Sequence, residues 1–455
     1  MPLPGVPAAH PKLIAPAPVV PKIGRVLGVA TAVRTERPVA MKLGDARRHL
    51  HLIGPSGVGK STLMAHIALD SLNAGEGGIV IDPIGDLAEN ILQRVPADRI
   101  DDVAVLDPRD GAPLGVAVLS GDPDLAADAV LSIFHSMYPD LGPRSSDILF
   151  HAVLTLARRG DASILLVPLL LTNPGFRRSV IGRVVKADPM GLGTFWGFFE
   201  GISDAERQAA IAPLMNKLRP LQRPAIRGVF GQRAPKFSFS DIFEKKKFLI
   251  VNLSKGTVGQ EAAALMGSIV VSMAWTAALA RVSVPVTKRS PVTIIIDELQ
   301  DYLRIGNLAD AMVQSRNLAV NLVVAHQHLG QLSPSTKSAI MANAKSRVAF
   351  NLGASDAREI AKTTRGELTH EDFQSLPAFQ AYASLLVDGT TAPWLSLSTQ
   401  PLPRPTRPSA DVRNRSRDLY GQPLDEVEAD LLSLIDNRTK SDDPIGRVPK
   451  GGSDD

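Results

Sequence analysis

Apolar and polar positions along this chain follow two different rhythms. Short apolar runs, typical of buried strands, alternate with segments whose apolar residues recur at helical spacing. Strands that alternate with helices predict an α/β fold with a mainly parallel sheet, which places ligands at the carboxyl ends of the strands. The predicted strands lie in residues 50–53, 77–82, 103–108, 246–256, 291–297, 318–327, 346–352 and 381–389.

Residues 123–235 break this alternation because helical spacing continues there without a clear strand. We therefore expect an all-α domain inserted into the α/β domain. The resulting organisation is a proline-rich, mobile N-terminal arm at 1–24, the α/β core in two parts at 25–122 and 236–400, the all-α domain at 123–235, and a flexible C-terminal tail with one short helix at 401–455.

Residues 262–280 form a run of 19 residues without a charge, which is long enough to cross a membrane. The run is rich in alanine and lies between two predicted strands of the core, so we interpret it as a helix buried within the α/β domain. The chain opens without the apolar core of a secretory signal. We expect no membrane span and a cytoplasmic protein.

The stretch "GPSGVGKST" directly follows the first predicted core strand and matches the pattern G-x-x-x-x-G-K-[ST]. Glycines let such a loop point successive N–H groups at phosphates, and the following helix offers its positive end. Lys60 is suited to the β- and γ-phosphates of ATP and Ser61 to Mg²⁺. The predicted nucleotide-binding residues are Gly54, Pro55, Ser56, Gly57, Val58, Gly59, Lys60, Ser61 and Thr62.

A second signal is the apolar strand in "TIIIDELQ", which ends in Asp297 and Glu298. A hydrolytic ATPase needs one carboxylate to hold the Mg²⁺ shell opposite Ser61 and another to orient the attacking water. We assign Asp297 to the metal and Glu298 to the water.

Composition narrows the classes of function only slightly. The chain has 50 basic and 46 acidic residues and no cysteine, which excludes disulfides and thiolate chemistry. Residues 217–247 hold nine basic residues against two acids. A surface that tracks DNA phosphates and an ordinary solvated face explain this excess equally well. The candidate DNA contacts are Arg223, Arg227 and Arg233.

The order of the motifs resembles the HerA/FtsK clade of ring-forming DNA motors, and within it the conjugative type IV secretion coupling proteins (TraD/TraG-like). The motifs that carry the resemblance are "GPSGVGKST", "IDPIGDL", "NLSKG", "IIIDELQDYL", "AMVQSRNLAVNLVVAHQHLGQL" and "NAKSRVAFNLGASDAREIA". The resemblance covers about residues 25–400. The chain shows no counterpart of the N-terminal membrane helices usual in that family.

The resemblance implies a RecA-like P-loop NTPase core, a homo-hexameric ring, an arginine finger at Arg316 and a γ-phosphate sensor at Gln327. His326 and His328 flank that glutamine, and we favour plain polar contacts for both because no third metal ligand lies nearby in the sequence.

Two classes of function remain open. The first is an ATP-driven motor that moves DNA in conjugation or a related process, with a membrane-protein or relaxase-type partner at the inner face of the membrane. The second is a nucleotide-switched assembly or defence ATPase that remodels a protein complex without moving DNA. Since no base-reading motif is evident, any DNA contact is expected to be tolerant of sequence.

Overall fold

The computed structural model describes residues 11–160, 163–302 and 308–439. The chain divides into two compact units. The α/β unit comprises Met1–Leu114 and Lys236–Gly421, and the helical unit comprises Gly115–Pro235 and Gln422–Asp455. The helical unit therefore interrupts the α/β unit and also includes the last part of the chain.

The α/β unit is built on an 11-stranded sheet with the order β2-β1-β13-β10-β9-β3-β8-β7-β4-β6-β5. The strands from β9 to β5 are parallel, whereas β2, β1, β13 and β10 form an antiparallel edge. A separate hairpin pairs β11 with β12. The strands are β1 (Arg25–Ala30), β2 (Pro38–Met41), β3 (Leu50–Ile53), β4 (Gly77–Asp82), β5 (Val103–Leu106), β6 (Phe248–Asn252), β7 (Val292–Ile296), β8 (Val320–His326), β9 (Ser346–Ala349), β10 (Gln380–Ser384), β11 (Leu386–Val387), β12 (Thr390–Thr391) and β13 (Leu395–Ser398).

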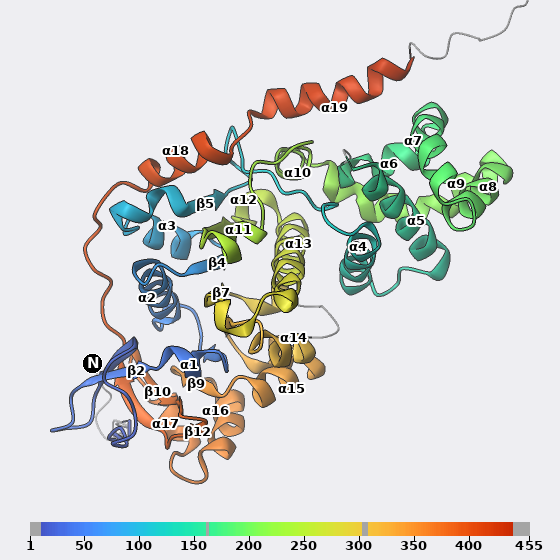
Figure 1. Ribbon diagram of the computed structural model, residues 1–455. Coiled ribbons are helices and arrows are strands. Elements are labelled where there is room, and N and C mark those ends of the chain that lie inside the picture. The colour runs from blue at the N-terminus through green and yellow to red at the C-terminus, as the bar shows by residue number, and fades with distance from the viewer. Residues whose placement is uncertain (1–10, 161–162, 303–307, 440–455) are drawn as a thin grey trace, which may run out of the picture. The chain divides into compact units, whose positions relative to one another are not determined.

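Helices lie on both faces of this sheet, with α2 and α3 on one side and α13 and α14 on the other (Figure 1). This arrangement explains why the central strands are buried along their whole length. The helices of the α/β unit are α1 (Leu43–Ala46), α2 (Lys60–Asn73), α3 (Asp86–Leu92), α11 (Ser240–Glu244), α12 (Lys255–Val258), α13 (Gln260–Leu279), α14 (Leu308–Ser315), α15 (Pro334–Asn343), α16 (Ala354–Ala361), α17 (His370–Gln374) and α18 (Ser409–Tyr420).

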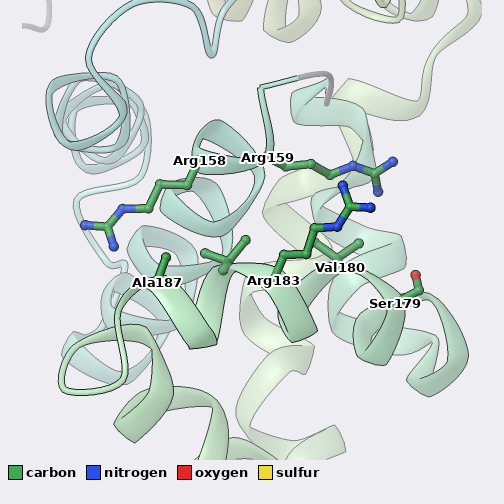
Figure 2. A pocket seen from close by; sticks show the side chains of 7 residues that line it. Arg158, Arg159, Ser179, Val180, Arg183 and Ala187 are labelled. Carbon is green, nitrogen blue, oxygen red and sulfur yellow. The ribbon is translucent and has the colours of Figure 1, made fainter.

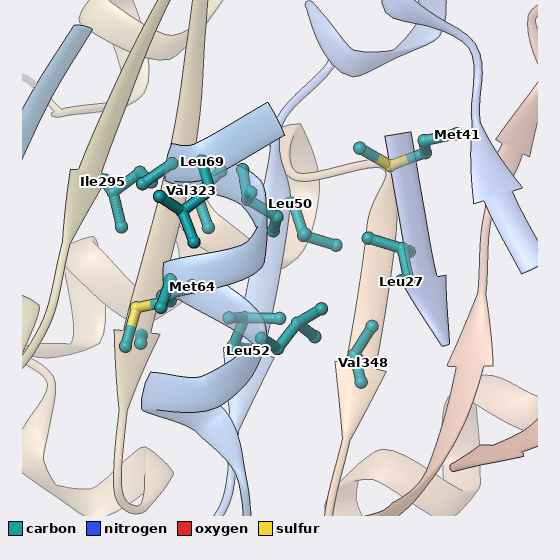
Figure 3. Close-up of a cluster of buried hydrophobic side chains, with 14 of the residues drawn as sticks. Leu27, Met41, Leu50, Leu52, Met64, Leu69, Ile295, Val323 and Val348 are labelled. Carbon is teal, nitrogen blue, oxygen red and sulfur yellow. The ribbon is translucent and has the colours of Figure 1, made fainter. Parts of the chain in front are cut away.

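The core of the α/β unit fills the space between the sheet and α2. Figure 3 shows Leu50 and Leu52 of β3 on the same side as Met64 and Leu69 of α2, and all but Leu69 are fully buried. Alternate residues of a strand face opposite sides, so His51 points to the other face of the sheet. The packing against α2 therefore fixes the start of this helix directly behind the end of β3.

α13 is long and apolar enough to cross a membrane by length and composition, and so is the bent pair Ile164–Thr172 and Pro174–Ala187 if it is counted as one span. Within the α/β unit, 56% of the most apolar window of α13 is buried. A side-chain carbon added at Gly267 would lie 2.2 Å from the ring of Tyr302, which shows how closely this helix packs. α13 thus has the buried position expected from the sequence.

The helical unit contains only helical elements among its described residues. Its core gathers large aromatic side chains, and the indole of Trp196 donates a hydrogen bond of 2.9 Å to the hydroxyl of Thr155. The helices are α4 (Pro123–Met137), α5 (Pro143–Arg159), α6 (Val167–Thr172), α7 (Pro174–Ala187), α8 (Leu192–Gly201), α9 (Asp204–Leu218), α10 (Pro224–Phe230) and α19 (Leu424–Thr439).

Part of each end of the chain packs against other residues of the structure. Residues 1–10 lie outside the described residues, but 11–24 pack on the α/β unit, where the Ile14 carbonyl accepts a hydrogen bond from Ser396 N–H at 3.0 Å. A proline-rich segment keeps its carbonyl acceptors, so it can accept hydrogen bonds from a strand of the sheet.

The tail holds two helices instead of one. α19 covers the helix predicted from the sequence, whereas α18 was not expected. The N–H of Val105 donates to the hydroxyl of Ser416 at 2.8 Å, and Arg413 pairs with Asp107 at 3.0 Å. Such contacts between residues about three hundred positions apart leave no local pattern in the sequence, and residues 440–455 lie outside the described residues.

Candidate nucleotide-binding site

The loop between β3 and α2 has the backbone of a phosphate cradle. Gly54, Gly57 and Gly59 all have positive φ angles, of 155°, 81° and 113°. A side-chain carbon at Gly54 would lie only 2.8 Å from Cβ of Phe350, so residues with a side chain are excluded there. No side chain caps the start of α2, which leaves its first N–H groups for an anion.

Lys60 is the first residue of α2, directly after this loop, and it is buried. Its ammonium group donates to the carbonyls of Gly54, at 2.5 Å, and Pro55, at 2.9 Å. Burial lowers the pKa of Lys60, and the carboxylates of Asp297 and Glu298 oppose that shift. The electrostatic coupling indicates that the lysine and the two acids face the same space.

Asp297 and Glu298 follow directly after β7, and their side chains are buried. Burial raises the pKa of Asp297 to about 7, and the neighbouring charges of Glu298 and Asp82 add to this shift. Both oxygens of Asp82 are already occupied, because they accept the N–H groups of Ile84 and Ala88 at the start of α3. Three carboxyl groups, those of Asp82, Asp297 and Glu298, thus stand against the one ammonium group of Lys60.

Glu298 is held in an unusual conformation. Its backbone is left-handed, with φ 50° and ψ 55°, which residues other than glycine rarely adopt. One carboxylate oxygen accepts the side-chain amide of Gln327 at 2.7 Å, and the other accepts that of Gln300 at 2.6 Å. These two amides fix the direction of the carboxylate.

Parallel pairing brings the parts of the site together at one edge of the sheet. In the register of β3 with β8, Ile53 lies opposite His326, so Gly54 and Gln327 leave the sheet side by side. β7 pairs with β8 on the other side and delivers Asp297 and Glu298 to the same edge. Residues as far apart in the sequence as Gly54 and Gln327 therefore belong to one site.

Arg316 is the predicted site residue that the structure does not bring to this edge. It is exposed in the turn that precedes β8, at the amino end of that strand. The seven residues of β8 separate it from Gln327, a length of roughly 23 Å at ~3.3 Å per residue. This exceeds the reach of an arginine side chain, so Arg316 cannot contact a nucleotide in the cradle of its own chain.

Three buried polar side chains form a hydrogen-bonded row beneath the cradle, which was not predicted from the sequence. Nε2 of His51 lies 2.7 Å from Nε2 of His326, and Nδ1 of His51 accepts the Nε–H of Arg347 at 3.3 Å. His326 therefore has the polar contact that we favoured over a metal. The described residues contain no group of three or more His, Asp or Glu side chains that could hold a metal ion.

The basic stretch at 217–247 is divided between the two units. The boundary between the two units falls at Lys236, and Arg227 is paired with Glu428 at 2.6 Å. Arg223 and Arg233 also have partners. The positive charge of Arg227 is thus neutralised by an ion pair within the helical unit.

A different basic region opens between α5 and α7 of the helical unit. The cavity there has a volume of about 420 Å³. Figure 2 shows that Arg159 and Arg183 extend to one side and Arg158 to the opposite side. Arg158 is held by Asp188 at 2.6 Å, whereas the side chain of Arg183 is exposed. This cavity was not singled out from the sequence.

A comparison with protein families finds a match for one part of the chain. Residues 204–384 match the family described as the type IV secretion-system coupling protein DNA-binding domain. This part of the chain is similar to that coupling-protein family. The matched part extends from α9 to β10 and includes Asp297, Glu298 and Gln327, but it begins after the phosphate loop. The resemblance inferred from the motifs is confirmed.

Solved structures agree on the fold. The plasmid coupling protein TrwB in complex with the ATP analogue ADPNP has a TM-score of 0.59 and 17% identity, over 89% of this chain and 98% of that chain. VirB4 of Thermoanaerobacter pseudethanolicus has a TM-score of 0.57 and 14% identity, over 84% of this chain and 97% of that chain. No curated protein sequence matches the chain. The predicted P-loop NTPase fold with an all-α domain is thus confirmed.

Proposed function

We propose that this chain is an ATP-hydrolysing motor of the type IV coupling-protein kind that moves DNA. The observation that carries the proposal is the clamped carboxylate of Glu298, which lies with Gln327 and Asp297 beside the phosphate loop. A loop that holds phosphates needs no such carboxylate for binding alone. A buried, oriented base next to it is what hydrolysis requires.

Each residue has a separate task in the proposed mechanism. Backbone N–H groups of residues 56–62 bind the phosphates of ATP, and Lys60 leaves the carbonyls of Gly54 and Pro55 to neutralise the β- and γ-phosphates. Glu298 orients the attacking water and accepts its proton. Gln327, which contacts Glu298 at 2.7 Å, links the state of the γ-phosphate to β8.

The acidic excess at this edge fits a divalent cation. Burial raises the pKa of Asp297 to about 7, the charges of Glu298 and Asp82 add to the shift, and a cation beside Asp297 would oppose it. Asp297 and the hydroxyl of Ser61 would hold Mg²⁺ between them. The ion would neutralise charge on the β- and γ-phosphates.

Hydrolysis in this proposal depends on a neighbouring chain. Arg316 is exposed and lies too far from its own cradle, so it supplies the second cation to the nucleotide of the next subunit. Such a donation in trans is suited to a closed homo-hexameric ring, in which every interface is the same.

DNA is the proposed substrate because the matched family is described as a DNA-binding domain. Arg223, Arg227 and Arg233 are the proposed phosphate contacts, and Arg183 at the cavity of the helical unit adds a candidate. Contacts to phosphates carry no sequence information, which suits a motor. We place the ring at the cytoplasmic face of the membrane, where it hands DNA to a membrane-protein or relaxase-type partner.

Measured ATP hydrolysis with and without DNA tests this proposal. We expect DNA of unrelated sequence to stimulate hydrolysis by the parent protein and to leave the Lys60→Ala variant inactive. Stimulation by a protein partner alone, with no response to single-stranded or duplex DNA, would support an assembly ATPase instead.

A further inference from the structure

We infer that Phe379 is the platform on which the base of the bound nucleotide stacks. The inference rests on the proposed nucleotide site and names the part of it that recognises the nucleoside. Phe379 lies in the loop between α17 and β10, more than three hundred residues after the phosphate loop.

The first argument is the contact between this loop and the phosphate cradle. The N–H of Phe379 donates to the carbonyl of Val58 at 2.8 Å. Cδ1 of its ring lies 3.0 Å from the position that a side-chain carbon on Gly59 would take. The ring therefore borders the cradle, and any group larger than hydrogen at Gly59 would press against it.

The second argument is the strained backbone. Phe379 has a φ angle of +65°, in the left-handed region that aromatic residues avoid. Its carbonyl accepts the N–H of Thr399 at 2.8 Å, so both backbone groups are tied to neighbours. Strained residues persist where the surroundings fix them, and they concentrate at ligand sites.

The third argument is exposure. Phe379 is 47% exposed, whereas most phenylalanines of the chain are buried, including Phe350, whose ring also approaches Gly59. Burial in the core therefore does not account for an aromatic residue at this position. A flat apolar face that remains open beside a phosphate loop is suited to a nucleobase.

The direction of the nucleotide supports the same assignment. The residues proposed to act on the γ-phosphate follow β8 and β7, on one side of β3. Phe379 precedes β10, and Thr399 follows β13, both on the opposite side of β3. A triphosphate whose γ end lies near Glu298 therefore points its nucleoside end toward Phe379.

The segment after β13 runs alongside α2. The carbonyl of Gln400 lies 3.0 Å from Nε2 of His66, one helical turn beyond Thr62. Among the described residues, the rings of Phe379 and Phe350 both approach Gly59, and of these two Phe379 is exposed whereas Phe350 is buried. Since stacking uses the face of the ring and every base has one, we expect ATP and GTP to bind with similar affinity.

Binding measurements with ATP, GTP and inorganic tripolyphosphate test the inference. Phe379→Asn removes the ring while placing a residue there that tolerates the left-handed backbone. We expect this variant to bind ATP about tenfold or more weakly, within the range for loss of one base stack, and to bind tripolyphosphate as the parent does. Phe379→Trp should retain the affinity for ATP. In hydrolysis, Phe379→Asn should raise KM and leave kcat unchanged.

Phe198→Ala is the matched control, because Phe198 is an exposed phenylalanine of the helical unit, and its affinity for ATP should not change. Unchanged ATP affinity in Phe379→Asn would overturn the inference, and so would an equal loss for tripolyphosphate, which indicates a distorted loop. A strong preference for ATP over GTP that survives in Phe379→Asn would contradict the stacking platform as well. If the parent binds neither ATP nor tripolyphosphate, the proposed function itself fails.

Discussion

Replacement of Glu298 by glutamine separates catalysis from nucleotide binding. The carboxylate of Glu298 accepts one amide from Gln327 and another from Gln300. A glutamine at 298 has only one acceptor oxygen, so one of these neighbours must turn its amide to offer oxygen instead of nitrogen. The two ends of an amide have nearly the same shape, and we therefore expect the fold and the affinity for ATP with Mg²⁺ to persist.

The loss in rate follows from the missing base. A positioned general base contributes at least about a hundredfold to the rate. This factor corresponds to roughly 2.7 kcal/mol in activation free energy at ~1.36 kcal/mol for each tenfold change. Hydrolysis by Glu298→Gln should thus fall by about a hundredfold or more.

Single-turnover hydrolysis with protein in excess over ATP measures this step directly, and equilibrium binding of ATP is measured beside it. Glu359→Gln is the control, since Glu359 forms a half-exposed ion pair with Lys337 at 2.8 Å, away from the site. It should hydrolyse ATP as the parent does. Turnover near that of the parent in Glu298→Gln would refute the assignment of the base.

Three further predictions concern the ring, the DNA contacts and stability. Lys60→Ala and Arg316→Ala should each be inactive alone and regain part of the activity when mixed, because one interface then pairs an intact cradle with an intact arginine. Verified mixed rings without hydrolysis would count against donation in trans. DNA binding should weaken, and its salt dependence flatten by up to about three contacts' worth of counterion release, when alanine replaces all of Arg223, Arg227 and Arg233; an unchanged affinity and salt slope would assign these residues to contacts within the chain. Burial lowers the pKa of His49 to about 4. The neutral imidazole therefore contributes fully to the stability of the fold above about pH 6.5. This contribution, up to roughly 3 kcal/mol, is lost as the pH falls from about 6.5 to about 4. Unfolding free energies against pH should show this slope in the parent and a smaller slope in His49→Asn, and equal slopes would remove the assignment.

The sequence predicted the parts of the site that depend on local pattern. The phosphate loop is specified by closely spaced glycines between a strand and a helix, and Asp297 and Glu298 end an apolar run. Parallel strands bring their carboxyl ends to one edge, so the approach of these segments followed from the fold class.

Contacts between distant segments could not be predicted in the same way. Phe379 reaches the loop through backbone hydrogen bonds, which any residue can form. The strands β1, β2 and β13 belong to the antiparallel part of the sheet, where β1 pairs with β13 although the two lie near opposite ends of the α/β unit in sequence. α18 is held by ion pairs such as that of Arg413 with Asp107, and its sequence alone is typical of a solvated segment.

Movement along DNA is the central claim, and displacement of a third strand from a DNA triplex measures it most directly. The account predicts that the parent protein displaces the third strand with ATP, and that neither a non-hydrolysable analogue nor the Lys60→Ala variant supports displacement. For single-stranded DNA, removal of streptavidin from a biotinylated end gives the equivalent measurement. DNA-stimulated hydrolysis of ATP without displacement on either substrate would contradict the account.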